Sequence, residues 1–284
     1  MKLIEPSVEI ITQEPGLQGI YKQIERVGRT CYKSLDRITE DSAEPFVERM
    51  CKSQHYAMCE HGTVYLIMPV GDADTYGAIE FYRVNPYSKV VFVMQDGENA
   101  AYITTNYRVI KENGFEDDLK YLCEPTQYHH KRLCLKFITS IGVSREFNRH
   151  RVASMAEQST RYCNFSKEKF GNEVTFILPE WVNTRCPNEE HGGPTVADIA
   201  WSDAMRDAET NYFLLLGEGW KPQQAREVLP LSTATEVVYT AFLDDWSHFF
   251  DLRYRETTGA AHPNAKQVAT MAHDLVLKEL NLDL

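Results

Sequence analysis

Apolar residues recur at helical spacing in several parts of the chain. Between residues 16 and 34 the recurring positions are Ile20, Ile24, Val27 and Cys31, which predicts a helix packed against a core. Similar patterns, with candidate caps and stop signals at their ends, predict further helices. We expect these over residues 41–54, 197–219, 222–229, 243–255 and 262–280.

Shorter runs rich in β-branched and aromatic residues predict strands. We expect strands over residues 8–12, 63–70, 87–95, 101–110, 133–143, 174–180 and 235–242. The polar QDGEN between the third and fourth of these runs is typical of a hairpin turn, whereas residues 55–62 should break a helix and residues 148–165 should form a loop. With no repeat and no Pro/Gly-rich linker, the pattern favours a single α+β domain over residues 1–284.

Composition narrows the class of protein. The chain has 284 residues, 43% hydrophobic and 25% charged, which is ordinary for a globular protein. Its net charge of -11 argues against nucleic-acid binding and against anionic membrane surfaces. No apolar run approaches the roughly 20 residues of a membrane span, and Glu5 and Pro6 interrupt the place of a signal-peptide core.

The cysteines and histidines do not suggest a metal site. Seven cysteines without a C-x-x-C pair make a zinc ribbon or a disulfide framework improbable, so we expect a cytoplasmic protein. His129, His130 and His191 lack convincing ligand spacing, and we expect no metal.

Positive charge is concentrated in one segment of this acidic chain. From His129 to Arg161 there are seven Lys/Arg against two acids, Glu146 and Glu157, a local balance of +5. Arginine suits bidentate capture of phosphate, and the small residues between the basic ones permit close approach of a ligand. The segment therefore predicts a pocket for a phosphate-bearing small molecule; the alternative is a solvated surface face.

Within this segment, Arg149-His150-Arg151 is followed after seven residues by Ser159. This spacing resembles the R-H-R-x7-S signature of the flavin-dependent thymidylate synthases, and the resemblance continues through Arg161 and Tyr162. Other stretches are similar to family segments in the same order: CEHGTVYLIM, GWKPQQAREVLPLSTATEVVYT, WSHFFDLR and AAHPNAKQVA. Together they span residues of about 15–70 and 133–280.

The resemblance implies a reaction and an architecture. The family converts dUMP to dTMP: methylenetetrahydrofolate supplies the carbon, NADPH reduces a bound FAD, and the reduced flavin supplies the hydride. Its fold is an α+β domain with a central, mostly antiparallel sheet flanked by helices. The domains assemble as a homotetramer in which several subunits build each active site.

The resemblance also implies roles for individual residues. The residues implied to meet the flavin are His61, Thr63, Arg149, His150, Arg151 and His248, with Glu157 between the flavin and dUMP. The residues implied to meet dUMP are Glu146, Arg149, Glu157, Ser159, Arg161, Arg226 and Arg253. Arg253 is implied to be catalytic, because a guanidinium near N3 and O2 of uracil stabilises negative charge and makes C5 more nucleophilic. A cysteine nucleophile is then unnecessary, and Cys186 lies in a polar segment typical of a surface loop.

The chain departs from the family pattern in four places. Ala156 replaces the usual asparagine, and Glu146 stands where glutamine is common. Residues 240–242 replace a T-G-N-like turn, so that turn's flavin contact is not carried over. An insertion at about 71–132 is expected to be a hairpin plus a helix. These differences leave open a non-catalytic relative that binds nucleotide and flavin; the acidic net charge counts against a single-stranded nucleic-acid binder.

Overall fold

The centre of the protein is a four-stranded antiparallel sheet with the order β2–β6–β9–β7. We describe a computed structural model over residues 1–71, 73–95, 98–184 and 193–284. The four strands are β2 (Ser7–Ile10), β6 (Arg132–Ser140), β9 (Ala234–Phe242) and β7 (Ser154–Glu157). This arrangement confirms the predicted α+β class and the mostly antiparallel central sheet.

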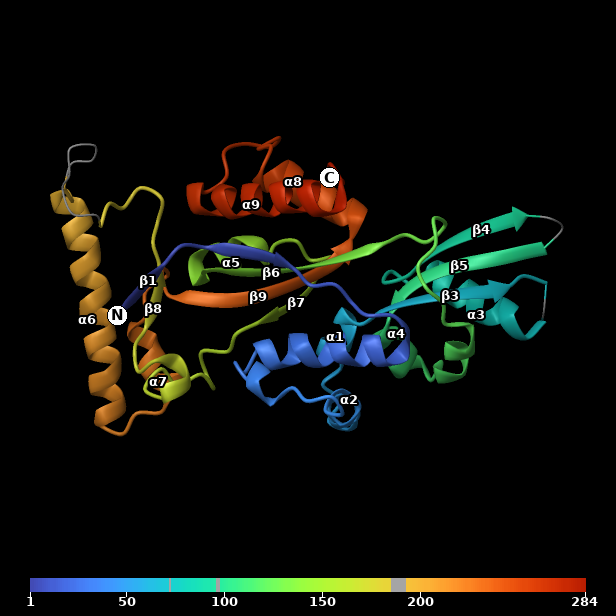
Figure 1. Cartoon of the computed structure of the whole chain (residues 1–284), viewed down its shortest axis with the longest axis horizontal. Coiled ribbons are helices and arrows are strands. Elements are labelled where there is room, and N and C mark those ends of the chain that lie inside the picture. Colours follow the sequence, from blue (N-terminus) through green and yellow to red (C-terminus); the bar gives the residue numbers. More distant parts are fainter. Residues whose placement is uncertain (72, 96–97, 185–192) are drawn as a thin grey trace.

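Alternating side chains of this sheet serve two different cores, one on each face. Leu133, Leu135 and Phe137 of β6 pack against helices α8 (Leu243–Arg253) and α9 (Pro263–Leu280). Cys134, between them in sequence, packs on the opposite face against Val27 of helix α1 (Gly16–Thr30). Figure 1 shows α8 and α9 above the sheet and α1 with α2 (Ala43–Lys52) below it.

A second antiparallel sheet has the order β3–β5–β4 and lies at the right of Figure 1. It contains β3 (Thr63–Pro69), β4 (Lys89–Gln95) and β5 (Glu98–Asn106), with α3 (Ala73–Val84) and α4 (Tyr107–Asn113) beside it. Its core includes Ile20 and Ile24 of α1 together with Ile103 of β5. The segment expected to be an insertion therefore shares a core with the N-terminal helix.

The opposite end of the elongated molecule is built around α6 (Val196–Gly217), which stands upright at the left of Figure 1. Met205 and Tyr212 of α6 pack with Phe165 and Phe176. Here β1 (Lys2–Ile4) pairs in parallel with β8 (Thr175–Ile177), and α7 (Pro222–Ala225) follows α6. Helix α5 (Ile141–Phe147) connects β6 to the signature segment.

Two sequence predictions about strand ends were wrong for identifiable reasons. Residues 107–110 belong to helix α4, because the Asn106 side chain caps that helix by accepting from the Val109 N–H at 3.1 Å. Residues 141–143 belong to helix α5, because the Ser140 side chain caps that helix by accepting from the Val143 N–H at 3.2 Å. The strand predicted over residues 235–242 is confirmed, since the ladder between β9 and β6 continues to Phe242, which pairs with Arg132.

Two predicted loops also contain regular structure. Residues 56–61 form a 3₁₀ helix, η2 (Tyr56–His61), and residues 154–157 form β7, which pairs with β9. Ala156 of β7 is buried in the apolar cluster with Val27, Cys134 and Val238. Burial among apolar side chains accounts for alanine at this position.

Along the residues that the structure describes, no helix combines the length and apolar character that crossing a membrane requires. The predicted hairpin turn includes residues 96 and 97, which lie outside the described residues.

Candidate active site

The segment from α5 into the signature runs between two open pockets, each of about 680 Å³. Residues of α5 and those from 157 to 161 line the first, which we call the Arg161 pocket. Arg149, His150 and Arg151 line the second, the Arg253 pocket, together with residues of α8 and the loop 258–261. Both volumes are in the range of small-molecule sites.

The Arg161 pocket gathers four of the residues expected to meet dUMP: Glu157, Ser159, Arg161 and Arg226. Arg145 also lines it. Three arginines thus line one cavity together with Ser159 and Thr160, a set of residues suited to an anion that accepts several hydrogen bonds.

Neighbouring hydroxyl groups fix two charged side chains of this pocket. Oε1 of Glu157 accepts from Ser144 Oγ at 2.7 Å and from Thr235 Oγ1 at 3.0 Å. Nη1 of Arg226 donates to Thr160 Oγ1 at 3.1 Å. Arg161, by contrast, is exposed, with its guanidinium 5.4 Å from the centre of the Tyr162 ring.

The Arg253 pocket is organised around Arg253, whose side chain is only 13% exposed. Its Nη1 lies 3.1 Å from Glu146 Oε2, and its Nη2 donates to the Glu146 carbonyl at 2.8 Å. Its Nε donates to His150 Nε2 at 3.3 Å. Because all three nitrogens of the planar guanidinium have partners, the orientation of the group is fixed.

The surroundings of His150 keep its imidazole ring neutral beside Arg253. Burial, followed by the Arg253 charge, lowers the pKa of His150 to about 4. At neutral pH the ring can therefore accept the hydrogen bond from Arg253. His248, Arg149 and Arg151 are exposed and line the same pocket.

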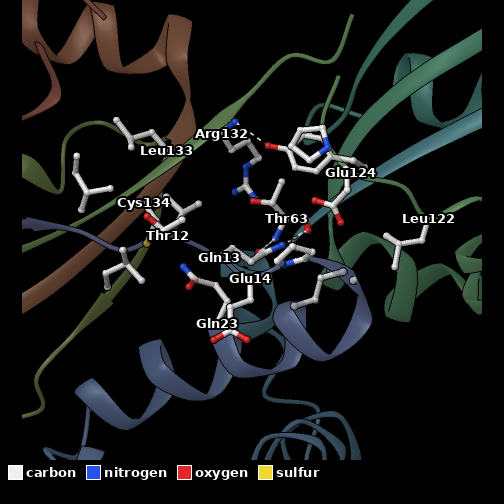
Figure 2. Close-up of a pocket in the computed structure, with 18 of the residues that line it drawn as sticks. Thr12, Gln13, Glu14, Gln23, Thr63, Leu122, Glu124, Arg132, Leu133 and Cys134 are labelled. Carbon is white, nitrogen blue, oxygen red and sulfur yellow. Dashed lines mark hydrogen bonds between the residues drawn. The ribbon is translucent and has the colours of Figure 1, made fainter. Parts of the chain in front are cut away.

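Thr63 lies elsewhere and lines a third cavity of about 230 Å³, which we call the Thr63 cavity (Figure 2). Gln13 bonds both the N–H and the carbonyl of Thr63, each at 2.8 Å. Arg132 donates to Thr63 Oγ1 at 3.3 Å and to the Glu60 carbonyl at 3.0 Å. Thr63 thus lines a cavity separate from the other two pockets.

His61 itself is fully buried under β9. Its Nδ1 lies 2.8 Å from Thr240 Oγ1, and no partner accepts or donates at Nε2 in the described part of the chain. Burial, and then the charge of Arg132, lower its pKa to about 3. The His61 ring is therefore neutral at neutral pH and lies in the interior of the single folded chain.

Several polar groups that hold the predicted site residues in place were not predicted from the sequence. Ser144 and Thr235 support Glu157, Thr160 supports Arg226, and Arg145 adds a charge to the Arg161 pocket. Of these residues, only Arg145 could be expected from the sequence, because it belongs to the basic segment. The Cys186 and His191 predictions fall outside the described residues, and among the described residues there is no group of three or more His, Cys, Asp or Glu side chains that could hold a metal ion.

Comparison with known proteins identifies the family. The family described as "Thymidylate synthase complementing protein" matches residues 119–280. Flavin-dependent thymidylate synthase of Pyrococcus furiosus is 30% identical over 182 residues, covering 62% of this chain and 69% of that protein. The chain belongs to the flavin-dependent thymidylate synthase family.

Two further members of this family match the chain. The Pyrococcus abyssi enzyme is 32% identical over 149 residues, covering 50% of this chain and 57% of that protein. The Thermosipho melanesiensis enzyme is 22% identical over 206 residues, covering 70% and 79%. A crystal structure of the UMP/dUMP methylase PolB from Streptomyces cacaoi, bound with 5-Br dUMP, is 17% identical with a TM-score of 0.45, covering 98% and 93%.

The matched residues 119–280 include both large pockets of this flavin-dependent thymidylate synthase family member. His61, Thr63 and helix α1 precede them. The R-H-R-x7-S signature and Arg253 therefore lie in the part of the chain on which the family assignment rests.

Proposed function

We propose that this protein catalyses the reductive methylation of dUMP to dTMP. Methylenetetrahydrofolate is the carbon donor and NADPH reduces the bound FAD. The observation that carries the proposal is the contact of His150, in the R-H-R triplet, with Arg253, which is 103 residues later in the chain. That contact places the signature beside the guanidinium expected to act on uracil.

The two large pockets suit the two nucleotides. The Arg161 pocket offers three guanidinium groups and the Ser159 and Thr160 hydroxyls, which fit the phosphate of dUMP. The Arg253 pocket has exposed Arg149, Arg151 and His248 around about 680 Å³, which fits a pyrophosphate-bearing flavin. When bound, the flavin supplies the hydride. We assign His61 and Thr63 to the flavin site as well, with His61 acting through its contact with Thr240.

Arg253 is the residue that we assign to catalysis. Its guanidinium stabilises negative charge on the pyrimidine at N3 and O2, which increases electron density at C5. Glu146 and His150 hold the guanidinium in one direction before the substrate arrives, so little reorganisation remains for the reaction itself. Glu157, fixed by two hydroxyls, provides an acceptor between the nucleotide and the flavin.

We further propose a cytoplasmic homotetramer with shared active sites. The chain would be one domain over residues 1–284 with an insertion at about 71–132. In a single chain, the phosphate-binding groups line one open pocket and Arg253 lines another. Closed symmetry is the usual way for identical chains to bring different surfaces together. The described cysteines are free, which suits a reducing compartment.

One observation favours a second candidate, a relative that binds flavin and nucleotide without catalysis. All three nitrogen positions of the Arg253 guanidinium have protein partners, and one partner is the negatively charged Glu146. In that case uracil would have to compete with the carboxylate for the arginine.

The deciding experiment is dTMP formation from dUMP by purified protein. The complete mixture should form dTMP, and omission of FAD, NADPH or methylenetetrahydrofolate in turn should abolish it. The protein should be yellow, and NADPH should bleach its flavin absorbance. Bleaching without dTMP would favour the second candidate, and protein that cannot be reconstituted with FAD would refute both.

A further inference from the structure

Two thiols touch in a part of the protein that none of the three cavities includes. Cys51 lies in the last turn of α2 and Cys59 lies in η2, with their Sγ atoms 3.9 Å apart. Only seven residues separate them in sequence. A disulfide bond requires the sulfurs to approach to about 2 Å, so the two Sγ atoms must move closer together before they can be joined.

The two thiols differ in the way that a reactive pair requires. Cys51 is half-buried and reaches solvent, whereas Cys59 is completely buried behind it. An oxidant therefore meets Cys51 first. A thiol that resolves the oxidised sulfur is then already in contact, which protects the site from irreversible oxidation.

Electrostatics makes Cys51 the more acidic of the two. The hydrogen bond from Cys59 lowers the pKa of Cys51 to about 7, and Lys111 of α4 acts in the same direction against the effect of burial. The same hydrogen bond and burial raise the pKa of Cys59. Since the thiolate is the nucleophile, Cys51 is the sulfur that attacks.

We propose that Cys51 and Cys59 form a reversible disulfide with hydrogen peroxide as the oxidant. The Cys51 thiolate attacks one peroxide oxygen, the O–O bond breaks, and the departing hydroxide takes up a proton to become water. This leaves a sulfenic acid on Cys51. Cys59 then attacks the Cys51 sulfur, the S–S bond forms, and the sulfenic oxygen leaves as a second water with the Cys59 proton.

Overall, two thiols and one hydrogen peroxide give one disulfide and two waters, a two-electron oxidation of the pair. A dithiol such as dithiothreitol reverses it by exchange. The bond would join the end of α2 to η2, whose last residues are Glu60 and His61. The site does not depend on the proposed activity, because it is defined by the two thiols alone.

Peptide mapping tests the proposal directly. The protein is reduced with dithiothreitol, freed of it, treated with a small excess of hydrogen peroxide, and digested with trypsin after alkylation. Cleavage after Arg49, Lys52 and Arg83 separates the cysteines, so a disulfide links peptides 50–52 and 53–83. We expect this linked pair, two hydrogens lighter than its parts, and its loss after renewed reduction. Unlinked, alkylated peptides 50–52 and 53–83 after treatment would overturn the proposal.

Three variants identify the order of events. Cys51→Ser should abolish the peroxide-dependent link, whereas Cys59→Ser should leave a sulfenic acid on Cys51 that dimedone traps. The matched control is Cys123→Ser, since Cys123 is also half-buried but its sulfur contacts a carbonyl and His129 instead of a thiol. It should behave like the parent protein.

A kinetic comparison covers the case in which Cys59→Ser fails to fold. In the unmodified protein at neutral pH, iodoacetamide should alkylate Cys51 at least about tenfold faster than Cys123, because burial raises the pKa of Cys123 to about 11. Equal rates would show that Cys51 is not an activated thiol and would overturn the assignment of the attacking sulfur.

Discussion

Arg253 has a partner for each nitrogen position of its guanidinium. A lysine at this position keeps the charge but provides one compact donor in place of the planar fork. We expect Arg253→Lys to lower the rate of dTMP formation at least about 100-fold, as for the loss of other pre-organised donors. The urea midpoint should change little. Steady-state kinetics and denaturation measure the two effects.

The control for this variant lies two residues along the chain. Arg255 also pairs with carboxylates, Asp251 and Asp283, but outside the described pockets. Arg255→Lys should retain nearly full activity. If both lysine variants are equally active, Arg253 is not the catalytic residue.

His61 predicts an acid sensitivity of the fold. Its pKa of about 3 in the folded chain is well below the value near 6.5 of an unfolded histidine. Between these values the unfolded state binds more protons, so stability is complete above about pH 6.5 and falls as the pH decreases. His61→Gln cannot take up this proton, and its urea midpoint should fall less than the parent's between pH 7 and pH 5.

The urea midpoint of a variant at an exposed histidine, measured against pH, distinguishes the effect of His61 from the general effect of acid on the fold. His262 is exposed, so His262→Gln is the control for replacing a histidine at the surface, and its midpoint is measured over the same pH range. Parallel pH profiles for the parent and His61→Gln would contradict the burial of a neutral ring.

Helix α6 begins with a reciprocal cap. The Thr195 hydroxyl accepts from the Asp198 N–H, and the Asp198 carboxylate accepts in return from the Thr195 N–H at 2.7 Å. Thr195→Ala removes this cap and should lower the free energy of unfolding by about 1 kcal/mol. Thr195→Ser should restore most of it, as measured by urea denaturation.

A second threonine of α6 provides the matched control. Thr210 is exposed in the helix interior, where its hydroxyl donates to the Arg206 carbonyl. Thr210→Ala should be neutral or slightly stabilising, since alanine has the higher helix propensity. If Thr195→Ala and Thr210→Ala lowered the free energy of unfolding equally, the cap at Thr195 would not stabilise the helix.

For the whole molecule, the separation of Arg161 and Arg253 into two pockets predicts complementation between subunits. Arg161→Ala and Arg253→Lys should each be nearly inactive alone. Co-expressed with different affinity tags and purified as mixed oligomers, they should regain about a quarter of the parent activity, because half of the subunit pairs would contain one intact site of two. Mixed oligomers with no activity above either variant would contradict shared sites.

The sequence by itself determined the elements whose information is local. Helices α6, α8 and α9 and strands β3 and β9 follow from periodicity within a single segment. The R-H-R-x7-S spacing also lies within one short stretch, which is why it indicated the family before any fold was known. The error at 107–110 was also local, since the Asn106 cap outweighs the strand propensity of the residues that follow.

Only the tertiary structure decided which charged groups pair and which distant apolar faces pack together. Lys136, one of the seven basic residues between His129 and Arg161, lies 3.1 Å from Glu236 and 3.5 Å from Glu9. Arg253 meets Glu146 across 107 positions, and the expected insertion buries Ile103 with Ile20 and Ile24. Periodicity reports which face of an element is apolar, but not which distant face will cover it. That choice depends on packing and charge pairing among all elements at once, which only the folded chain defines.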